Sequence, residues 1–163
     1  MPHKYLMKEF EEFARSATSA ESLMQHIGQR IHTHIPRYNW VGFYVIDKND
    51  PTMLLLGPYT GSFSPNPKIS MDQGLCGAAA STGRVVAADN VAEDLRYLQA
   101  SDLVKSQIAV PMLAGGRAVG VFNVESYFLS TFKLPVECEF VQACAKLAGK
   151  CFEKAVVRDL VNV

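Results

Sequence analysis

The chain has 163 residues, 48% of them hydrophobic and 20% charged, which is the size and balance of a single globular domain with a substantial core. The 16 basic and 16 acidic residues cancel, and no segment gathers enough Lys and Arg to form a nucleic-acid or anionic-membrane surface. No apolar run approaches the ~20 residues of a membrane span, and the charged N-terminal segment is unlike a secretory signal. We therefore expect a cytoplasmic protein that binds neither nucleic acid nor membrane.

Residues 4–34 have the pattern of two helices. Between Lys4 and Ala17 the apolar residues recur at steps of three and four, the period of an amphipathic helix. Thr18 and Glu21 match a capping box that would begin a second helix, and Pro36 cannot continue that helix.

Residues 38–126 predict a sheet with loops. The apolar segments 40–46 and 53–56 flank a charged, turn-forming break and predict a β-hairpin. Residues 57–67 carry three prolines and two glycines, which favours a surface loop. Small residues from Gly74 to Gly83 then predict a short, tightly packed helix.

The following segments complete this sheet. Residues 84–88 predict a short strand, and residues 89–105 predict a loop with one helical turn. Segments 108–113 and 118–125 flank a Gly-Gly pair, which is a strong two-residue turn for a second hairpin.

The last predicted element is a helix over about residues 134–161, with Pro135 at its first position. Its length of roughly 40 Å, at 1.5 Å per residue, exceeds what a domain of this size needs, so we expect a homodimer formed through the terminal helices. The order of elements predicts a single α+β domain over residues 1–163, with helices packed on an antiparallel sheet.

The cysteines and histidines do not form a recognisable metal or disulfide pattern. No two cysteines form a Cys-x-x-Cys motif, and we expect Cys144 and Cys151 to pack in the core of the last helix. The histidines lie in or before the first helical region, where we expect surface side chains and no metal: His3, His26, His32 and His34. We expect no cofactor.

Four segments, taken in order, resemble the signatures of the free methionine-(R)-sulfoxide reductases, over about residues 20 to 155. They are Ile35-Pro36-Arg37-Tyr38-Asn39-Trp40-Val41-Gly42-Phe43-Tyr44, Leu56-Gly57-Pro58-Tyr59, Gly74-Leu75-Cys76-Gly77 and Ala118-Val119-Gly120-Val121-Phe122-Asn123-Val124-Glu125-Ser126. The resemblance implies a GAF fold, in which terminal helices pack on one face of a central antiparallel sheet. Loops and short helices form a pocket on the other face.

In that family, the residues that match Trp40 and Tyr44 form the pocket wall around the substrate's sulfur. The two residues are four positions apart, so on a strand both point to the same face, although both could also be simple core aromatics. Three acidic positions of the family map to Gln107, Asn123 and Glu125, of which only Glu125 is acidic. The resemblance therefore implies a ligand preference that has changed, unless Gln107 and Glu125 are ordinary residues at the solvent side of edge strands.

The family's chemistry uses a thiolate that attacks the sulfoxide, and a second cysteine that resolves the product as a disulfide. Of the three family cysteines, the first aligns with Asn66 and the usual attacking residue falls near Ala100, so only Cys76 remains. Cys76 lies at the start of the predicted short helix, where the helix dipole would lower its pKa. The alternative is an inert cysteine kept for packing.

Three functions are consistent with these residues. The first is a non-catalytic GAF-type module that binds an unknown small molecule for sensing or signal transduction, with Trp40, Tyr44, Gln107, Asn123 and Glu125 as ligand-binding residues. The second is a divergent free methionine-(R)-sulfoxide reductase that relies on Cys76, and the third is a dimerisation module without a ligand. The lost nucleophile and the neutral replacements favour the first.

Overall fold

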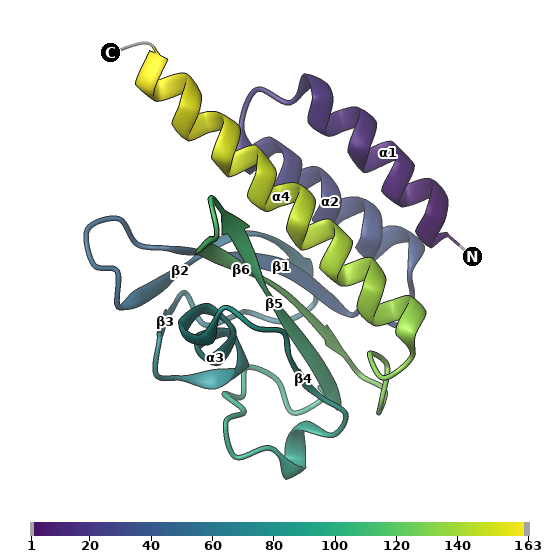
Figure 1. Ribbon diagram of the computed structural model, residues 1–163. Helices are drawn as coiled ribbons and strands as arrows, with labels where there is room; N and C mark the ends of the chain where they lie inside the picture. Colours follow the sequence, from purple (N-terminus) through teal and green to yellow (C-terminus); the bar gives the residue numbers. More distant parts are fainter. Residues whose placement is uncertain (1, 162–163) are drawn as a thin grey trace.

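The computed structural model describes the backbone of residues 2–161 and the side chains of residues 2–155. Its elements follow the chain as shown in Figure 1. They are α1 (His3–Ser16), α2 (Ala20–His34), β1 (Trp40–Ile46), β2 (Met53–Gly61), β3 (Lys68–Ser70), α3 (Gly74–Thr82), β4 (Val86–Ala88), the 3₁₀ turn η1 (Val91–Glu93), β5 (Ser106–Ala114), β6 (Arg117–Ser126) and α4 (Pro135–Val161).

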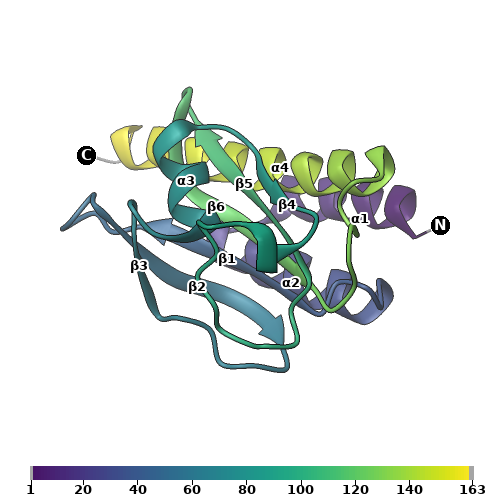
Figure 2. The same cartoon turned by 90° about the horizontal axis from the view of Figure 1, so that it is seen from below.

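The strands form one antiparallel sheet in the order β3-β2-β1-β6-β5-β4. Helices α1, α2 and α4 cover one face, whereas α3 and the loops around it cover the other, as Figure 2 shows from a second direction. This is the α+β arrangement that the sequence predicts.

Alternate residues of β1 contribute to two separate cores. Val41 and Phe43 pack among the helices on one face, and Phe43 stacks on Phe122 of β6 with 4.5 Å between ring centroids. Trp40 and Tyr44 pack on the opposite face against α3 and the loops. The expected period-two placement of these two aromatic residues is therefore confirmed.

The helical layer is built on buried apolar stripes. Leu6 and Phe10 of α1, and Ile27 and Ile31 of α2, are fully buried in the core shared with α4. On α4, Cys144 is fully buried, and Cys151 also lies in that core, as expected from their spacing. Burial raises the pKa of the Cys144 thiol, which fits a packing role.

Three local predictions need correction. The N-cap of α2 is Ser19, whose Oγ accepts a hydrogen bond from the Ser22 backbone N–H at 3.1 Å, and not Thr18, because Ser19 directly precedes the first helical residue. Strand β2 continues to Gly61 through the segment predicted as a loop, because its second half pairs with β1 as far as Trp40. The three-residue strand β3 was not predicted.

The expectation of surface histidines is wrong for His3. Its side chain is buried, and its Nε2 lies 2.6 Å from Oε1 of Glu137, which also accepts a hydrogen bond from the Tyr38 hydroxyl at 3.0 Å. His26 is half-buried and stacks on Phe13. Both histidines help to pack α1 against other helices. The apolar periodicity of one helix does not reveal such contacts between helices.

The β5–β6 hairpin turns through Gly115 and Gly116 with φ of 58° and 80°. Two successive positive φ angles are typical of the tight turn that the Gly-Gly pair predicts.

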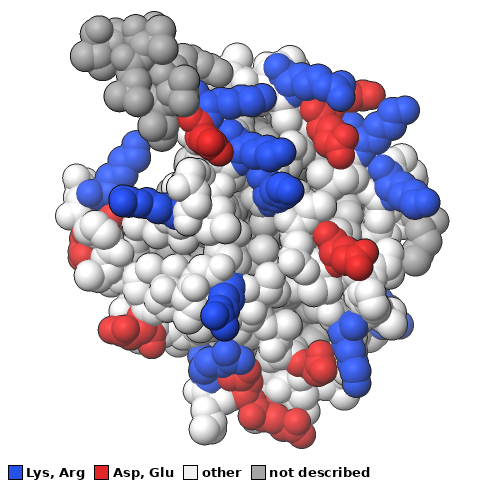
Figure 3. Space-filling model, in the orientation of Figure 1, with Lys and Arg blue, Asp and Glu red and all other residues white. Residues whose placement is uncertain are grey.

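Charged side chains of both signs alternate over the face that carries α4, as Figure 3 shows. Within the described part of the chain, no helix has the length and apolarity needed to cross a bilayer.

Candidate functional site

The candidate site lies on the face of the sheet opposite the terminal helices. A small cavity of about 20 Å³ lies there, lined by residues of β1, β3, β5, β6, α3 and two loops. Its lining residues are Tyr44, Pro65, Asn66, Ile69, Gly74, Leu75, Cys76, Leu98, Ala100, Gln107, Asn123 and Glu125. This volume holds about one water molecule.

Trp40 forms a wall beside this cavity, lying flat against the sheet. Its ring fits over Gly42 of the same strand and Gly61 of β2, where a Cβ atom would collide with the indole. The Trp40 ring stacks on Tyr59 at 5.5 Å and on Phe63 at 6.0 Å between centroids. The indole is fully buried, and its Nε1 has no hydrogen-bond partner among the described residues.

Tyr44 connects the sheet to the loop that covers the cavity. Its hydroxyl donates a hydrogen bond to the backbone carbonyl of Asn66 at 2.8 Å. Burial is the main cause that raises the pKa of Tyr44, with smaller contributions from Cys76 and Glu125, so Tyr44 stays a neutral donor near pH 7. The same loop is held at its other end by a 2.7 Å hydrogen bond between the Ser62 and Tyr127 hydroxyls.

A chain of buried hydrogen bonds crosses β5 and β6 at the base of the cavity. Gln107 Nε2 donates to Asn123 Oδ1 at 2.8 Å, and Asn123 Nδ2 donates to Glu125 Oε2 at 3.2 Å. Each of the three side chains is at most 5% exposed. The oxygen of the Gln107 amide, Oε1, has no hydrogen-bond partner among the described residues. These hydrogen bonds therefore fix the orientation of side chains that line the cavity, and they leave one buried amide oxygen without a partner among the described residues.

Glu125 is the only carboxyl among the described residues that line this cavity. Desolvation raises its pKa to about 7, and the hydrogen bond from Asn123 partly opposes that shift. A carboxyl that titrates near neutral pH can accept or donate a proton under physiological conditions.

Cys76 is the third residue of α3 and is buried in the same cavity. Burial, and then the neighbouring Glu125, raise the pKa of the Cys76 thiol well above its ordinary value. The predicted lowering by the helix dipole is thus wrong, because loss of solvent around a fully buried thiolate outweighs the dipole of a nine-residue helix.

The structure places all the sequence-predicted site residues in one region. Tyr44, Cys76, Gln107, Asn123 and Glu125 line the cavity, and Trp40 packs beside it against Tyr44. Gln107 and Glu125 are therefore not solvent-side residues of edge strands. Their role in ligand binding stays a prediction.

The cavity is also lined by residues that the sequence analysis did not predict as binding residues. Asn66 and Ala100, which take the place of two family cysteines, face it from the two covering loops. Leu98 lines it as well, and Tyr97 lies close enough for Glu125 to help raise the pKa of its hydroxyl. No local sequence pattern distinguishes Tyr97 and Leu98 from other residues of that loop.

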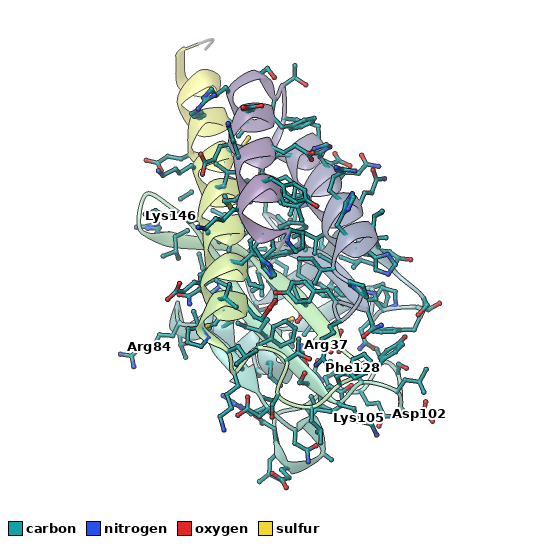
Figure 4. All side chains as sticks on the ribbon, turned by 90° about the vertical axis from the view of Figure 1, so that its right-hand side faces the viewer. Arg37, Arg84, Asp102, Lys105, Phe128 and Lys146 are labelled. Carbon is teal, nitrogen blue, oxygen red and sulfur yellow. The ribbon has the colours of Figure 1, made fainter. Side chains whose placement is uncertain are left out.

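Several larger hollows lie elsewhere in the described part of the molecule. A groove of about 790 Å³ runs between α4 and the β5–β6 hairpin and includes Lys146. Another, of about 620 Å³, includes Asp102, Lys105 and Phe128, which lie at one end of the molecule in Figure 4. Arg37 stacks on the Phe128 ring at 4.9 Å. None of these hollows is lined by a cysteine among the described residues, so the small cavity is the better candidate for redox chemistry.

Comparisons with known proteins identify the family and the fold of the chain. The GAF domain model matches residues 19–152. The free methionine-R-sulfoxide reductase of Saccharomyces cerevisiae is 31% identical over 134 residues, which are 82% of this chain and 72% of the yeast protein. Among solved structures, the free methionine-R-sulfoxide reductase of Neisseria meningitidis, in complex with its substrate, is similar with a TM-score of 0.85 and 25% identity, covering 93% of this chain and 88% of that one. The type II enzyme of Thermoplasma acidophilum has a TM-score of 0.75 and 26% identity, over 89% of this chain and 96% of that one.

Proposed function

The chain belongs to the GAF domain family, and from that premise we propose that it is a divergent free methionine-R-sulfoxide reductase that works from Cys76. The comparisons favour this reading over the non-catalytic module that the sequence alone favoured. The observation that carries the proposal is that Cys76 and Glu125, a carboxyl with a pKa of about 7, line the same small cavity.

Cys76 would supply the two electrons of the reaction. Its sulfur attacks the sulfoxide sulfur and forms an S–S bond as the sulfoxide oxygen is protonated. The S–O and S–S bonds then break as the oxygen is transferred to the Cys76 sulfur, which leaves Cys76 as a sulfenic acid and the substrate as a thioether. Glu125 in its carboxylate form takes the thiol proton and returns a proton to the sulfoxide oxygen. This proton transfer offsets the raised pKa of the buried thiol.

An external thiol would complete the cycle. It condenses with the Cys76 sulfenic acid to give a mixed disulfide and water, and a second thiol then releases Cys76 as a thiol. No resolving cysteine lines the cavity among the described residues, so the reductant must reach it from solvent. A thiol-rich compartment suits this requirement, and a cytoplasmic location is part of the proposal.

The cavity must open for substrate to enter. It holds about one water molecule, whereas a methionine side chain with its sulfoxide is far larger. Segments 62–67 and 94–105 cover it, and the Tyr44–Asn66 and Ser62–Tyr127 hydrogen bonds hold the first of them in place. These two loops are therefore the parts that would have to move.

The test is reduction of free methionine-R-sulfoxide with a small dithiol as the reductant, comparing the wild-type protein with Cys76→Ser. We expect turnover in the wild type and a loss of at least 100-fold in the variant. Cys138→Ser, at a half-buried position on α4 away from the cavity, is the matched control and should keep full activity.

The second candidate is the non-catalytic ligand-binding module. The full burial of Cys76 favours it, since a thiol with a strongly raised pKa is a poor nucleophile unless a base assists. Binding of methionine sulfoxide with no turnover, in wild type and Cys76→Ser alike, would support this candidate and refute the reductase.

A further inference from the structure

The new inference concerns the class of sulfoxide that the cavity accepts, and it rests on the proposed function. We propose that the site prefers an uncharged sulfoxide with an amide N–H over the free, zwitterionic amino acid, which remains a substrate but the poorer of the two. The reason is that Glu125 is the one carboxyl among the described residues that line the cavity and is used for proton transfer. Gln107 and Asn123 are then the residues that set this preference.

The cavity lining carries no positive charge among the described residues. Among the described residues around the cavity there is no Lys, Arg or His, and Glu125 alone can carry charge near pH 7. The titratable groups that face Glu125 are Cys76 of α3, Tyr44 of β1 and Tyr97 of the covering loop, all with raised pKa and therefore neutral. A bound carboxylate would meet no cation, and burying an unpaired charge is strongly unfavourable.

Glu125 cannot both bind an ammonium group and transfer protons in the reaction. An ammonium group bound at Glu125 would stabilise the carboxylate and lower its pKa toward the ordinary range. Glu125 would then be a weak base toward Cys76 and would not protonate the sulfoxide oxygen. With an uncharged ligand, the carboxyl keeps its pKa near 7 and both steps remain available.

The buried hydrogen bonds of Gln107 and Asn123 also favour an uncharged ligand. Asn123 uses its Oδ1 to accept from Gln107 and its Nδ2 to donate to Glu125, so it is held in one orientation. That orientation leaves Gln107 Oε1 as a buried acceptor, in a side chain that is 95% buried, with no partner among the described residues. A neutral amide N–H satisfies this oxygen without bringing a charge into the cavity.

The experiment compares free methionine-R-sulfoxide with its desamino amide, which has the same sulfoxide chain, no ammonium and an amide in place of the carboxylate. We expect kcat/KM to be at least tenfold higher for the desamino amide. Binding of the two corresponding sulfones, which cannot be reduced, is measured by calorimetry and should show the same order of affinity.

Substitutions of Gln107 and Asn123 test whether these two amide side chains set the ligand preference. Gln107→Glu adds a second carboxyl and should shift the preference at least tenfold toward the free amino acid, and Asn123→Asp should do the same if the first variant fails to fold. Gln142→Glu, an equal change at an exposed position of α4, should leave the preference unchanged.

The outcomes separate this inference from the proposed function. Tighter binding of the desamino sulfone amide, with no reduction of either sulfoxide, would support the inference and refute the reductase. Reduction that is faster with free methionine-R-sulfoxide would support the reductase and overturn the inference. Failure of both sulfones to bind would also overturn the inference.

Discussion

Ala100 is the position at which a single substitution should change the proposed sulfoxide reduction most. It lies on a covering loop and lines the cavity that contains Cys76, but it is only half-buried. A thiol there would keep more contact with solvent than the fully buried Cys76, so its thiolate would form more readily. A cysteine at this position could act as a nucleophile, or could resolve a Cys76 sulfenic acid as a disulfide.

We therefore expect Ala100→Cys to raise the rate of sulfoxide reduction at least tenfold, measured as substrate-dependent oxidation of a dithiol. Ser101→Cys is the matched control, because residue 101 lines a different hollow together with Tyr97 and Val104. An equal gain in both variants would show that any added surface thiol is sufficient and would contradict the role assigned to Ala100.

Glu125 should also affect stability, in a way that depends on pH. Its pKa of about 7 in the folded protein exceeds the ordinary value of 4.5. Between these two values the folded state holds a proton that the unfolded state has released, so stability falls as pH rises through this window. The pKa difference corresponds to roughly 3 kcal/mol at most.

The prediction is that Glu125→Gln gains stability relative to the wild type as pH rises, by up to about 3 kcal/mol between pH 4.5 and pH 8. Urea unfolding of both proteins at several pH values measures this difference. Parallel pH profiles of the two proteins would mean that Glu125 does not titrate with a raised pKa.

At the scale of elements, the β1–β2 pair is shaped around one indole ring. Glycine at positions 42 and 61 lets Trp40 lie against the strands, and a Cβ at Gly42 would lie 2.5 Å from Trp40 Cη2. Gly61→Ala would likewise contact Trp40 Cδ1. Either substitution must push the ring toward the covering loop, at a cost of about 1–3 kcal/mol for an overpacked site.

The chain contains a single tryptophan, so its fluorescence reports this displacement directly. We expect Gly61→Ala to shift the Trp40 emission to longer wavelength and to lower stability in urea unfolding. Gly28→Ala in α2, where a Cβ would be 3.6 Å from its nearest neighbour, should leave the emission unchanged. An unaltered spectrum in Gly61→Ala would show that the ring does not depend on these glycines.

The elements differ in how well the sequence predicts them. The Gly115-Gly116 turn and the alternation of Trp40 and Tyr44 depend on neighbouring residues alone, and both were predicted correctly. Strand β3 has three residues and exists only because it pairs with β2, which no local pattern encodes. The raised pKa of Cys76 likewise results from tertiary burial, and the position of that residue in a helix gave the opposite expectation.

At the scale of the molecule, the site depends on the separation of two cores by the sheet. Residues on one face pack against α1, α2 and α4, and residues on the other face against α3 and the covering loops. This separation would let the loops move to admit the proposed ligand without disturbing the larger helical core. This separation is consistent with a rigid sheet that carries Gln107, Asn123 and Glu125 and a more adaptable cover.

The length of α4 leads to a prediction about assembly. The helix has 27 residues, about 40 Å at 1.5 Å per residue, and Figure 1 shows its C-terminal end extending beyond the sheet. A helix gains little stability from its own propensity, so packing against another element favours a helix of this length. We propose that a second copy of the chain supplies this partner and forms a homodimer through the terminal helices.

Sedimentation should then give twice the chain mass of 18.0 kDa for the full chain. A variant that ends at residue 155 should sediment as a monomer while keeping its circular dichroism and its Trp40 emission, because the described core contacts of α4 lie before that point. If the full chain is a monomer at micromolar concentration, or if the shortened chain stays dimeric, the terminal part of α4 is not the interface. Loss of reductase activity together with the dimer would further show that the proposed activity depends on assembly.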